Sequence, residues 1–578
     1  MAEEDIMWGK KRHLFGGIEP SNLLGIQIER SAGSSYIYLR LTLPKDTVVD
    51  GQVLCTVQGF VVRRKTGSYP VDEFDGVLVE DRDLIVGQST LVSDRVDDSN
   101  ETYYYAVFPY STQGVYNRNS ANRAVSYPVA EGDYIFGYDL DTNDPDPDTR
   151  VIYPDDVDNY PYRALRLGPD GTGCTKEYLN MLAPEYGSNI GDATGWFAIR
   201  AGEKFMPRPC MLSYDCDWSG GNSYYLAVSD YKRKYGTTEA SDITNVEYNG
   251  NAMMQWPKIY TYREEVDGIY KFRCSNKPHG VGWDCWCNYI DTHGETDHFY
   301  TSIFHATMDA NNIPRSISSS NLYTLTAPNC TLGAAIDLVT GKSGSYWTRG
   351  YGGWDVECLA DRLLIQDLLV MMAGTTNTSS VYGYGRSKEY SETAAGGVNN
   401  NEGGLFYTDT ITSTSTIGHR LFGMENLWGN VGRLCVGWII DNGVQKIKIT
   451  RGRKDGSTAY DFNDTGSGYI VLDDADISPY GTDSPNGYIS EMKTTAFGRI
   501  PLVKHNASAG AGSSATYETD YFWAAKSGLY TGYLGGCVSN SSSYMSTYYG
   551  AYYAVTTTTS SKNQKVSFGL SCKPVEEA

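Results

Sequence analysis

Apolar and polar positions alternate along several short stretches in the first part of the chain. YIYLRLTL at 36–43 alternates, VLCTVQGFVVRRK at 53–65 has the pattern of a strand pair, and TYYYAVFPY at 102–110 carries tyrosines at alternate positions. Turn-forming sequences such as TGSYP and DDSNE separate these stretches. Short strands at this spacing are typical of a β-sandwich, which we expect over residues 21–128.

An acidic, proline-containing stretch, YDLDTNDPDPDTRVIYPDDVDNYP, follows at 138–161. Asp139, Asp141 and Asn143 stand two positions apart, as the first ligands of a calcium-binding loop do. An EF-hand loop would need glycine where Asp144 stands and glutamate where Arg150 stands, so calcium is the less favoured interpretation. We expect a proline-stiffened acidic connector that shares little core with its neighbours, together with a β-rich subdomain, over residues 129–200.

From residue 201 to 578 the pattern is again that of short strands and loops, interrupted by one clear helix. DVECLADRLLIQDLLVMMAG at 355–374 has apolar residues spaced three and four apart, with Asp355 as the expected N-cap and Gly374 as the expected stop. This predicts a helix that packs into a core. Its apolar positions are Leu359, Leu363, Leu364, Leu368, Leu369 and Met372, and the polar interruptions are Asp361, Arg362, Gln366 and Asp367.

Charge and hydropathy exclude several classes of partner. The formal net charge is -21 and the sequence pI is about 4.8, which argues against binding to nucleic acid or to anionic membranes. No run of 18 apolar residues is present, so no membrane insertion is expected. The start, MAEEDIMWGKK, lacks the layout of a signal peptide. We expect residues 1–20 to be a docking segment, with a disordered tail as the alternative.

Cysteine and tyrosine usage refine this picture. The 12 cysteines are irregularly spaced without a CxxC pair, which favours reduced and mostly buried thiols. A strand would place Cys285 and Cys287 on one face. The 47 tyrosines far exceed the 16 phenylalanines. Tyrosine is better suited to a half-exposed binding surface than to a plain core.

Metal-binding and catalytic signatures are incomplete. The segment 279–298 combines ligand atoms that zinc would accept, but their spacing matches no usual zinc pattern, so a buried strand and a polar loop are preferred. GKS at 341–343 lacks the first glycine of a P-loop, and acidic pairs are too common here to single out two glycosidase carboxylates. We therefore expect no metal and no cofactor. The zinc candidates are His279, Cys285, Cys287, His293 and His298.

The stretch LFGMENLWGN at 421–430 places a tryptophan before a glycine and an asparagine. Gly429 and Asn430 suit a tight turn in which positive φ is inexpensive. Trp428 and Trp438 are then expected to pack as large structural anchors, and a direct ligand contact by Trp428 is the alternative.

Two motifs in this order carry a resemblance. LFGMENLWGNVGRLCVGWI at 421–439 resembles the GNVWEW core region of the formylglycine-generating-enzyme family, a subtype of the C-type lectin-like fold. It resembles still more closely phage tail proteins that carry ENLWGN. The stretch 528–573 resembles the family's closing Gly-Gly turn, at Gly535 and Gly536, its variable loop and its final strand, which contains Phe568.

A second resemblance concerns the first domain. TYYYAVFPYSTQGVYN at 102–117 resembles the F strand and F–G loop of fibronectin type III-like modules in phage tail proteins. Tyr103 and Tyr105 are the candidates for the tyrosine corner of such modules. Weaker similarity to phage tail proteins runs through 205–212, 297–309 and the helical segment, so the resemblance covers most of the chain.

Departures from the family pattern bear on activity. GRL at Gly432–Leu434 replaces the usual WEW, and the paired cysteines of the oxygen-using enzymes are lacking, because only Cys537 and Cys572 lie in the C-terminal part. No EPN, QPD or WND motif of calcium-dependent lectins occurs. The resemblance therefore implies neither enzyme activity nor calcium-mediated sugar binding.

The expected fold is mainly β and multidomain: an immunoglobulin- or fibronectin-like sandwich, then a loop-rich C-type lectin-like α+β domain with one or two helices. The resemblance implies a tail or tail-fibre tip protein of a virion that recognises a host cell-surface glycan or protein. It also implies other virion tail proteins as partners, and a homo-oligomer, often a trimer. Alternatives are a structural virion protein of the collar, baseplate or head, and an enzyme of formylglycine-generating or cell-wall hydrolase type.

The expected contact surface is the variable loop SSSYMSTYYGAYYA at 541–554. It sets aromatic residues among small Ser, Thr, Gly and Ala residues, as antibody paratopes do. Packing of these tyrosines on sheet faces is the alternative. The expected receptor-binding residues are Tyr544, Tyr548, Tyr549, Tyr552 and Tyr553.

Overall fold

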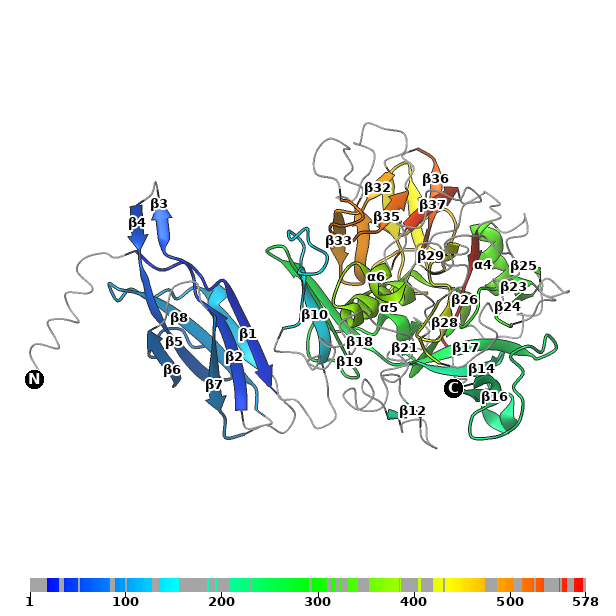
Figure 1. Cartoon of the computed structure of the whole chain (residues 1–578), viewed down its shortest axis with the longest axis horizontal. Coiled ribbons are helices and arrows are strands. Elements are labelled where there is room, and N and C mark those ends of the chain that lie inside the picture. Colours follow the sequence, from blue (N-terminus) through cyan, green and yellow to red (C-terminus); the bar gives the residue numbers. More distant parts are fainter. Residues whose placement is uncertain are drawn as a thin grey trace, which may run out of the picture. The chain divides into compact units, whose positions relative to one another are not determined.

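The computed structural model divides the chain into two compact units, which are described separately (Figure 1). The first unit comprises Met1–Ile135 with Pro154–Tyr160, and the second comprises Phe136–Tyr153 with Pro161–Ala578. The structure describes residues 18–30, 36–49, 52–83, 89–98, 101–126, 135–154, 185–186, 193–194, 207–228, 230–290, 294–308, 313–318, 323–324, 331–340, 353–383, 385, 404–406, 419–429, 432–472, 486–502, 512–523, 527–534, 550, 554–558 and 566–574.

In the part that the structure describes, the first unit comprises two antiparallel sheets and one small hairpin. One sheet has the order β1-β2-β7 and the other β6-β5-β8-β9, while β3 and β4 form the hairpin. All three stretches predicted from alternation are strands. The bounds are β1 Gly25–Arg30, β2 Tyr36–Thr42, β3 Thr47–Val49, β4 Gln52–Cys55, β5 Val57–Thr66, β6 Val77–Asp83, β7 Ser89–Arg95, β8 Tyr103–Ser111 and β9 Arg123–Ser126, with a 3-10 turn η1 at Ser120–Asn122.

Alternating residues of the two sheets meet in one core. Leu39 of β2, Val62 of β5 and Val107 of β8 are buried in the same hydrophobic cluster, as strands with one inward face require. The two candidate corner tyrosines differ in their partners. The Tyr103 hydroxyl accepts a hydrogen bond from the backbone N–H of Asp98 at 3.3 Å, whereas the Tyr105 hydroxyl donates to the Asp94 carboxylate at 2.6 Å.

The second unit is built on two large sheets. The seven-stranded antiparallel sheet has the order β16-β15-β14-β17-β22-β39-β26, so β39, from near the end of the sequence, lies between two earlier strands. Its strands are β14 Arg208–Ser213, β15 Tyr224–Ala227, β16 Asp230–Lys234, β17 Gly250–Pro257, β22 His298–Ser302, β26 Trp354–Val356 and β39 Leu570–Cys572.

The eight-stranded sheet is mixed. Its order is β31-β30-β29-β36-β37-β35-β32, and β38 pairs with β29 in parallel. Its strands are β29 Gly432–Asp441, β30 Val444–Ile447, β31 Ile470–Val471, β32 Asn486–Tyr488, β35 Tyr521–Trp523, β36 Leu529–Leu534, β37 Ala554–Thr558 and β38 Val566–Phe568.

Smaller elements complete the second unit. A four-stranded sheet has the order β11-β10-β19-β18, and the remaining strands form short pairs and one three-stranded sheet. The bounds are β10 Ile135–Asp141, β11 Val151–Ile152, β12 Glu185–Tyr186, β13 Ala193–Thr194, β18 Tyr260–Val266, β19 Ile269–Ser275, β20 Tyr289–Ile290, β21 Gly294–Glu295, β23 Thr307–Met308, β24 Pro314–Arg315, β25 Tyr323–Thr324, β27 Arg420–Leu421, β28 Met424–Glu425, β33 Glu491–Thr495 and β34 Gly498–Leu502, with 3-10 turns η3 Ser219–Gly221 and η4 Trp286–Asn288.

The acidic stretch differs from its expected role. Residues 136–153 belong to the second unit, where β10 pairs with β19, and Tyr138 is fully buried with its hydroxyl donating to Asp367 at 2.9 Å. Arg150 is buried as well and forms an ion pair with Glu518 at 3.1 Å. The expectation that this part shares little core is therefore wrong, because an aromatic ring and a paired guanidinium anchor it. Residues 155–161 lie outside the described part.

Three α-helices occur among the described residues: α4 Leu332–Thr340, α5 Leu359–Ala373 and α6 Thr378–Tyr382. The predicted helix is α5, and Gly374 ends it in the left-handed conformation with φ of 63°. Its N-cap is Cys358 and not Asp355, because Asp355 lies in β26 and is paired with Ser571 of β39. The helix α4 was not expected from the sequence.

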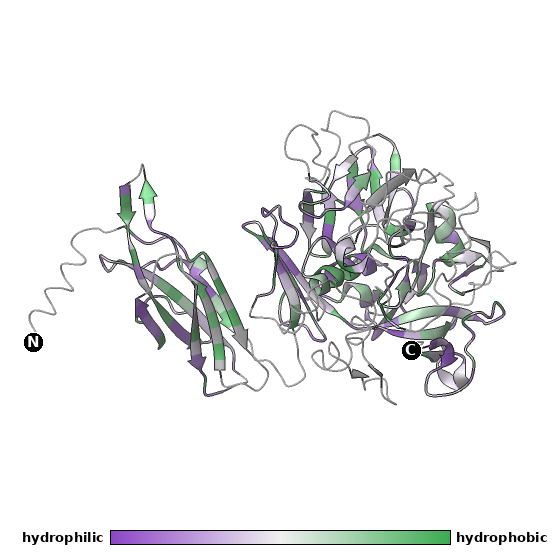
Figure 2. Cartoon of the chain, viewed as in Figure 1, coloured by the Kyte–Doolittle hydropathy of each residue, from purple (hydrophilic) through white to green (hydrophobic). Residues whose placement is uncertain are grey.

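The main core of the second unit lies between the large sheets and α4. Buried residues from β17, β26, β29 and β39 share one hydrophobic cluster with the apolar face of α4. Figure 2 shows the hydrophobic colour concentrated on α5 and on strands of both large sheets. The fold class is thus mainly β with several sheets, as expected. Within the described residues, no helix is long and apolar enough to cross a membrane.

Candidate functional site

The ENLWGN segment begins at Glu425, the last residue of the short hairpin of β27 and β28. The backbone has positive φ in the hairpin turn at Phe422 (50°) and Gly423 (79°), and again in the segment at Asn426 (54°) and Gly429 (73°). Gly429 thus has the positive φ that the expected turn requires, while Asn430 lies outside the described residues. Such backbone geometry fixes the side chains on either side of it, and these side chains point into the interior.

Trp428 is a buried packing residue. It is 1% exposed, and its indole N–H donates to the carbonyl oxygen of Gly383 at 3.0 Å, just after α6. Its ring lies 4.4 Å from that of His419 and 6.4 Å from that of Tyr382, measured between centroids. The indole therefore links the ENLWGN segment to the end of α6, and it is enclosed by the described residues around it.

Trp438 anchors a different place, the middle of β29. Its indole N–H donates to Gln445 Oε1 at 2.9 Å, and its ring stacks on Phe522 with centroids 5.7 Å apart. A Cβ atom at Gly532 of β36 would lie 2.0 Å from this ring, so the glycine is required for the indole to lie against the neighbouring strand. Phe568, in β38, is also fully buried.

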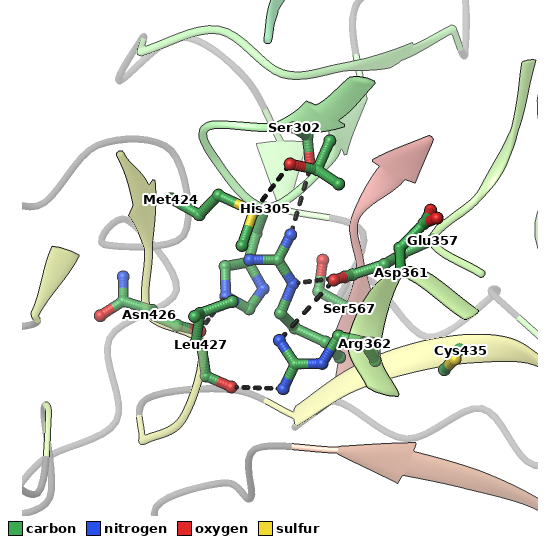
Figure 3. Close-up of polar contacts among 12 residues, drawn as sticks. Ser302, His305, Glu357, Asp361, Arg362, Met424, Asn426, Leu427, Cys435 and Ser567 are labelled. Atoms are coloured by element: carbon green, nitrogen blue, oxygen red, sulfur yellow. Dashed lines mark hydrogen bonds and ion pairs between the residues drawn. The ribbon is translucent and has the colours of Figure 1, made fainter. Parts of the chain in front are cut away.

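A network of buried charges joins the ENLWGN segment to the rest of the core (Figure 3). Glu357, just before α5, accepts a hydrogen bond from Arg433 Nε at 2.8 Å and forms an ion pair with Arg362 at 3.6 Å. Arg433 also donates to Ser302 Oγ at 3.2 Å, and Arg362 donates to the carbonyl oxygen of Leu427 at 3.1 Å. One carboxylate therefore holds two guanidinium groups that also donate to the segment, Arg433 to the carbonyl oxygen of Glu425 and Arg362 to that of Leu427.

His305 is part of the same network. Its Nε2 lies 3.0 Å from the backbone carbonyl oxygen of Asn426, and since a carbonyl can only accept, Nε2 carries the proton. Burial lowers the pKa of His305 well below its ordinary value, and the nearby Arg433 lowers it further. The imidazole is therefore neutral at physiological pH.

His419 is a second neutral histidine. Burial lowers its pKa to about 3, and the positive charges of Arg362 and Arg433 act in the same direction. Neither ring nitrogen has a hydrogen-bond partner among the described residues. The imidazole ring instead packs against the ring of Trp428, so His419 contributes to the core by filling the space beside this tryptophan.

A further buried carboxylate ties the core to the closing strand. Asp361 of α5 accepts a hydrogen bond from Ser571 Oγ at 2.7 Å and forms an ion pair with Lys573 Nζ at 3.3 Å. Burial raises the pKa of Asp361, and Lys573 and Ser571 oppose that rise. Because burying one such charge alone is costly, these pairs fix β39 against α5 in a single register.

The residue types in this cluster, histidine, serine, glutamate, arginine and cysteine, are those that catalytic sites use. In this structure, however, these side chains are buried: Ser302, His305 and Glu357 are 0% exposed and Cys435 is 1% exposed. The polar contacts of these side chains therefore hold together segments that are far apart in the sequence.

The expected receptor-binding tyrosines, at positions 544, 548, 549, 552 and 553, lie outside the described residues, as do Gly535 and Gly536. Their flanks are placed by sheet register. β36 and β37 are antiparallel neighbours in which Leu534 pairs with Ala554, so residues 535–553 connect adjacent strand ends. Connections in hairpins usually have two to five residues, and longer ones are commonly functional.

The same end of the eight-stranded sheet carries further tyrosines. Leu534 also closes the pairing of β36 with the beginning of β29, three residues after Gly429. Tyr521 of β35 and Tyr488 of β32 pair across the strands there, with ring centroids 5.2 Å apart and both side chains half-buried. The tyrosine-rich connection therefore ends at Ala554, which pairs with Phe522, the neighbour of Tyr521 in β35.

The metal candidates are engaged in other contacts. Cys285 and Cys287 are buried, and Cys285 precedes the 3-10 turn η4, which contains Cys287, so the expected strand is wrong here. His279 packs against Trp283 and lies 2.9 Å from Ser275 Oγ, and His293 is outside the described residues. Asp139 forms an ion pair with Arg273 at 2.8 Å. Among the described residues, no group of three or more acidic, histidine or cysteine side chains could hold a metal ion.

Comparison of the chain with models of known protein families and with curated proteins finds no match.

Proposed function

We propose that this chain is a tail or tail-fibre tip protein of a bacteriophage that binds a host cell-surface glycan or protein. In this proposal the first unit is a fibronectin type III-like module, and the second contains a C-type lectin-like domain. The chain acts in the virion, as a homo-oligomer that contacts other tail proteins, and it has no enzyme activity. The proposed identity as a phage tail protein is supported by the sequence motifs that resemble those of phage tail proteins.

The observation that carries the binding role is the place of the tyrosine-rich connection. It joins two adjacent strands at the end of the eight-stranded sheet where Tyr488 and Tyr521 pair. A rigid sheet with a long loop at its end is a common arrangement for recognition, because the sheet positions the loop while the loop varies. Tyrosines among small polar residues add large contact areas at low entropic cost.

The buried network supports the proposed absence of catalysis. Its histidines are neutral and enclosed, and its carboxylates are engaged with arginine and lysine side chains. These contacts stabilise the segment from which β29 starts. The end of the sheet next to this segment is therefore a firm base for a binding loop.

The test begins with the full chain and a panel of bacterial cell-surface polysaccharides and whole cells. Each of the five tyrosines is then changed to alanine, and binding and the Tm are measured for every variant. We expect at least one variant to lose roughly 1–3 kcal/mol of affinity with little change in Tm. Tyr460, which is exposed in the same unit but far along the sequence, gives the matched control Tyr460→Ala, which should bind normally.

Two results would count against the proposal. If every loss of binding is accompanied by an equal loss of Tm, the tyrosines are core residues. If all five variants bind as the unchanged protein does, the contact surface lies elsewhere.

A structural virion protein without receptor contact is the second candidate, and one observation favours it. The β3–β4 hairpin of the first unit exposes Val48 (54%), Val49 (49%), Val53 (56%) and Leu54 (38%), and Figure 2 shows its hydrophobic colour. Such an apolar ribbon is typical of an assembly contact. Labelling the chain in intact particles would separate the two candidates, because a location away from the fibre tip favours the structural role.

A further inference from the structure

The turn that follows β14 brings together two thiols that are 356 positions apart in the sequence. Cys216 Sγ lies 3.5 Å from Cys572 Sγ, which belongs to β39 in the interior of the seven-stranded sheet. Cys572 is fully buried, whereas Cys216 is half-buried; the other cysteines that the structure describes are all buried. Cys216 is therefore the more exposed member of the pair, and a reagent from solution is expected to meet it first.

Several contacts hold the turn in this position. The carbonyl oxygen of Tyr214 accepts a hydrogen bond from the indole N–H of Trp354 at 2.9 Å, and the two rings meet edge to face. Trp354 lies in β26 and pairs directly with Cys572 in the sheet. The turn is thus fixed over the part of the sheet that contains Cys572.

The backbone at Cys216 is itself unusual. Its φ is 53°, in the left-handed region that residues other than glycine seldom adopt, and its N–H donates to the carbonyl oxygen of Ser213 at 3.0 Å. Strained conformations of this kind persist where the surrounding structure determines them. Here the conformation presents the thiol of Cys216 to that of Cys572.

We propose that Cys216 and Cys572 are oxidised to a disulfide bond, and that the oxidant is a low-molecular-weight disulfide such as oxidised glutathione. The proposal rests on this geometry and not on the proposed function. A disulfide bond needs a sulfur–sulfur distance of about 2.05 Å, so small side-chain rotations must bring the two sulfurs closer.

The reaction has two exchange steps. The thiolate of Cys216 attacks one sulfur of oxidised glutathione, forms a mixed disulfide and releases one glutathione thiolate. The thiolate of Cys572 then attacks the Cys216 sulfur and releases the second glutathione. Overall the two cysteines lose two electrons and two protons, and one oxidised glutathione becomes two reduced molecules.

The second step is expected to be the slower one. Burial raises the pKa of the Cys572 thiol well above its ordinary value, and the neighbouring Cys216 raises it further. The thiolate is the attacking species, so closure should accelerate as the pH is raised. Once formed, the bond would fasten the turn after β14 to β39.

The full chain, reduced and freed of reductant, is incubated with oxidised glutathione at mildly alkaline pH. We expect the intact mass to fall by about 2 Da as two thiols are lost, and a digest to yield one peptide pair joining Cys216 to Cys572. The Tm should rise by a few degrees or more, because the bond restricts the unfolded chain.

The variants Cys216→Ser and Cys210→Ser form a matched pair. Cys210 is a buried neighbour in the same hydrophobic cluster, so its replacement should leave the bond intact, whereas Cys216→Ser should abolish it. If Cys210→Ser fails to fold, Cys55→Ser in the first unit replaces it as the control. A mixed disulfide at Cys216 that never resolves, a bond from Cys216 to another cysteine, or an unchanged thiol count would each overturn the proposal.

Discussion

Trp428 allows the most direct test of the interior at the scale of single residues. It is enclosed by Tyr382 and His419 and donates to the carbonyl oxygen of Gly383. Trp428→Ala should therefore lower the free energy of unfolding of the second unit by about 3–5 kcal/mol. Chemical denaturation followed by fluorescence would measure this loss.

Trp428→Phe is the matched control, because it keeps an aromatic ring but removes the indole N–H. It should lose clearly less stability than Trp428→Ala. An alanine variant that keeps its Tm and loses receptor binding would show that the tryptophan contacts a ligand.

His419 makes stability depend on pH. Its pKa is about 3 in the folded protein and near 6.5 when unfolded, so between these values the unfolded chain binds a proton that the folded chain excludes. The contribution of His419 to the free energy of unfolding is therefore fully present above about pH 6.5. It falls as the pH is lowered, by up to about 1.4 kcal/mol per pH unit. The variant His419→Phe keeps an aromatic ring at this position but has no ionisable group.

The measurement is the free energy of unfolding of both proteins at pH 6.5 and pH 5. We expect the unchanged protein to lose more stability than His419→Phe, and the difference isolates His419 because His305 and the carboxylates are common to both. Equal losses in the two proteins would mean that His419 is protonated or accessible in the folded state.

The sequence contains a signal for the buried network, but a local pattern cannot interpret it. Asp361, Arg362 and Asp367 interrupt an otherwise apolar helix, which would ordinarily indicate a solvent-facing side. All three are buried: Arg362 pairs with the nearby Glu357, whereas Asp361 pairs with Lys573 and Asp367 pairs with Arg263, both from distant segments. Pairing across 212 and 104 positions cannot be read from spacing along one helix.

At the scale of elements, the contact between β29 and β36 depends on one small residue. Gly532 does not require positive φ, yet a Cβ there would lie 2.0 Å from the ring of Trp438. Gly532→Ala should therefore lower the free energy of unfolding by about 1–3 kcal/mol through overpacking. Thermal or chemical unfolding would measure this.

Gly25→Ala is the control for a strand glycine with space around it, since its nearest neighbour would be Thr42 Oγ1 at 3.6 Å. It should change stability little. If Gly532→Ala is equally mild, the indole of Trp438 moves easily and does not fix the register of the two strands.

Element types were easier to predict than their ends. The alternation at 36–43 and the apolar spacing of α5 each identified the right element. The start of α5 was misplaced because Asp355 suits a cap locally, whereas its pairing with Ser571 in β39 draws it into a strand. The helix α4 was missed, because Gly333 and the short length of the helix weaken its pattern.

At the scale of the whole molecule, the unit boundary makes a prediction about fragments. Residues 136–578 contain all of the second unit together with Pro154–Tyr160, which belongs to the first. This fragment should fold alone with a cooperative melting transition, because Tyr138 and Arg150 keep their buried partners, Asp367 and Glu518. Calorimetry of the purified fragment would show this transition.

A fragment of residues 162–578 is the sharper comparison. It leaves Asp367 without the hydroxyl of Tyr138 and Glu518 without Arg150, although Arg499 remains beside Glu518. We expect a lower Tm than for the longer fragment, since removing one partner of a buried ion pair is costly. Equal melting of the two fragments would restore the view that residues 136–153 are a mere connector.

The place of β39 has a consequence for how the protein is made. The strand lies between β22 and β26, both of which leave the ribosome more than 200 residues earlier, so the seven-stranded sheet stays open during synthesis. The first unit can fold while the chain grows, but the second must wait with two unpaired strand edges exposed. Such edges promote aggregation, so the yield of the protein should depend on chaperones and on slow translation, even though each finished unit is compact.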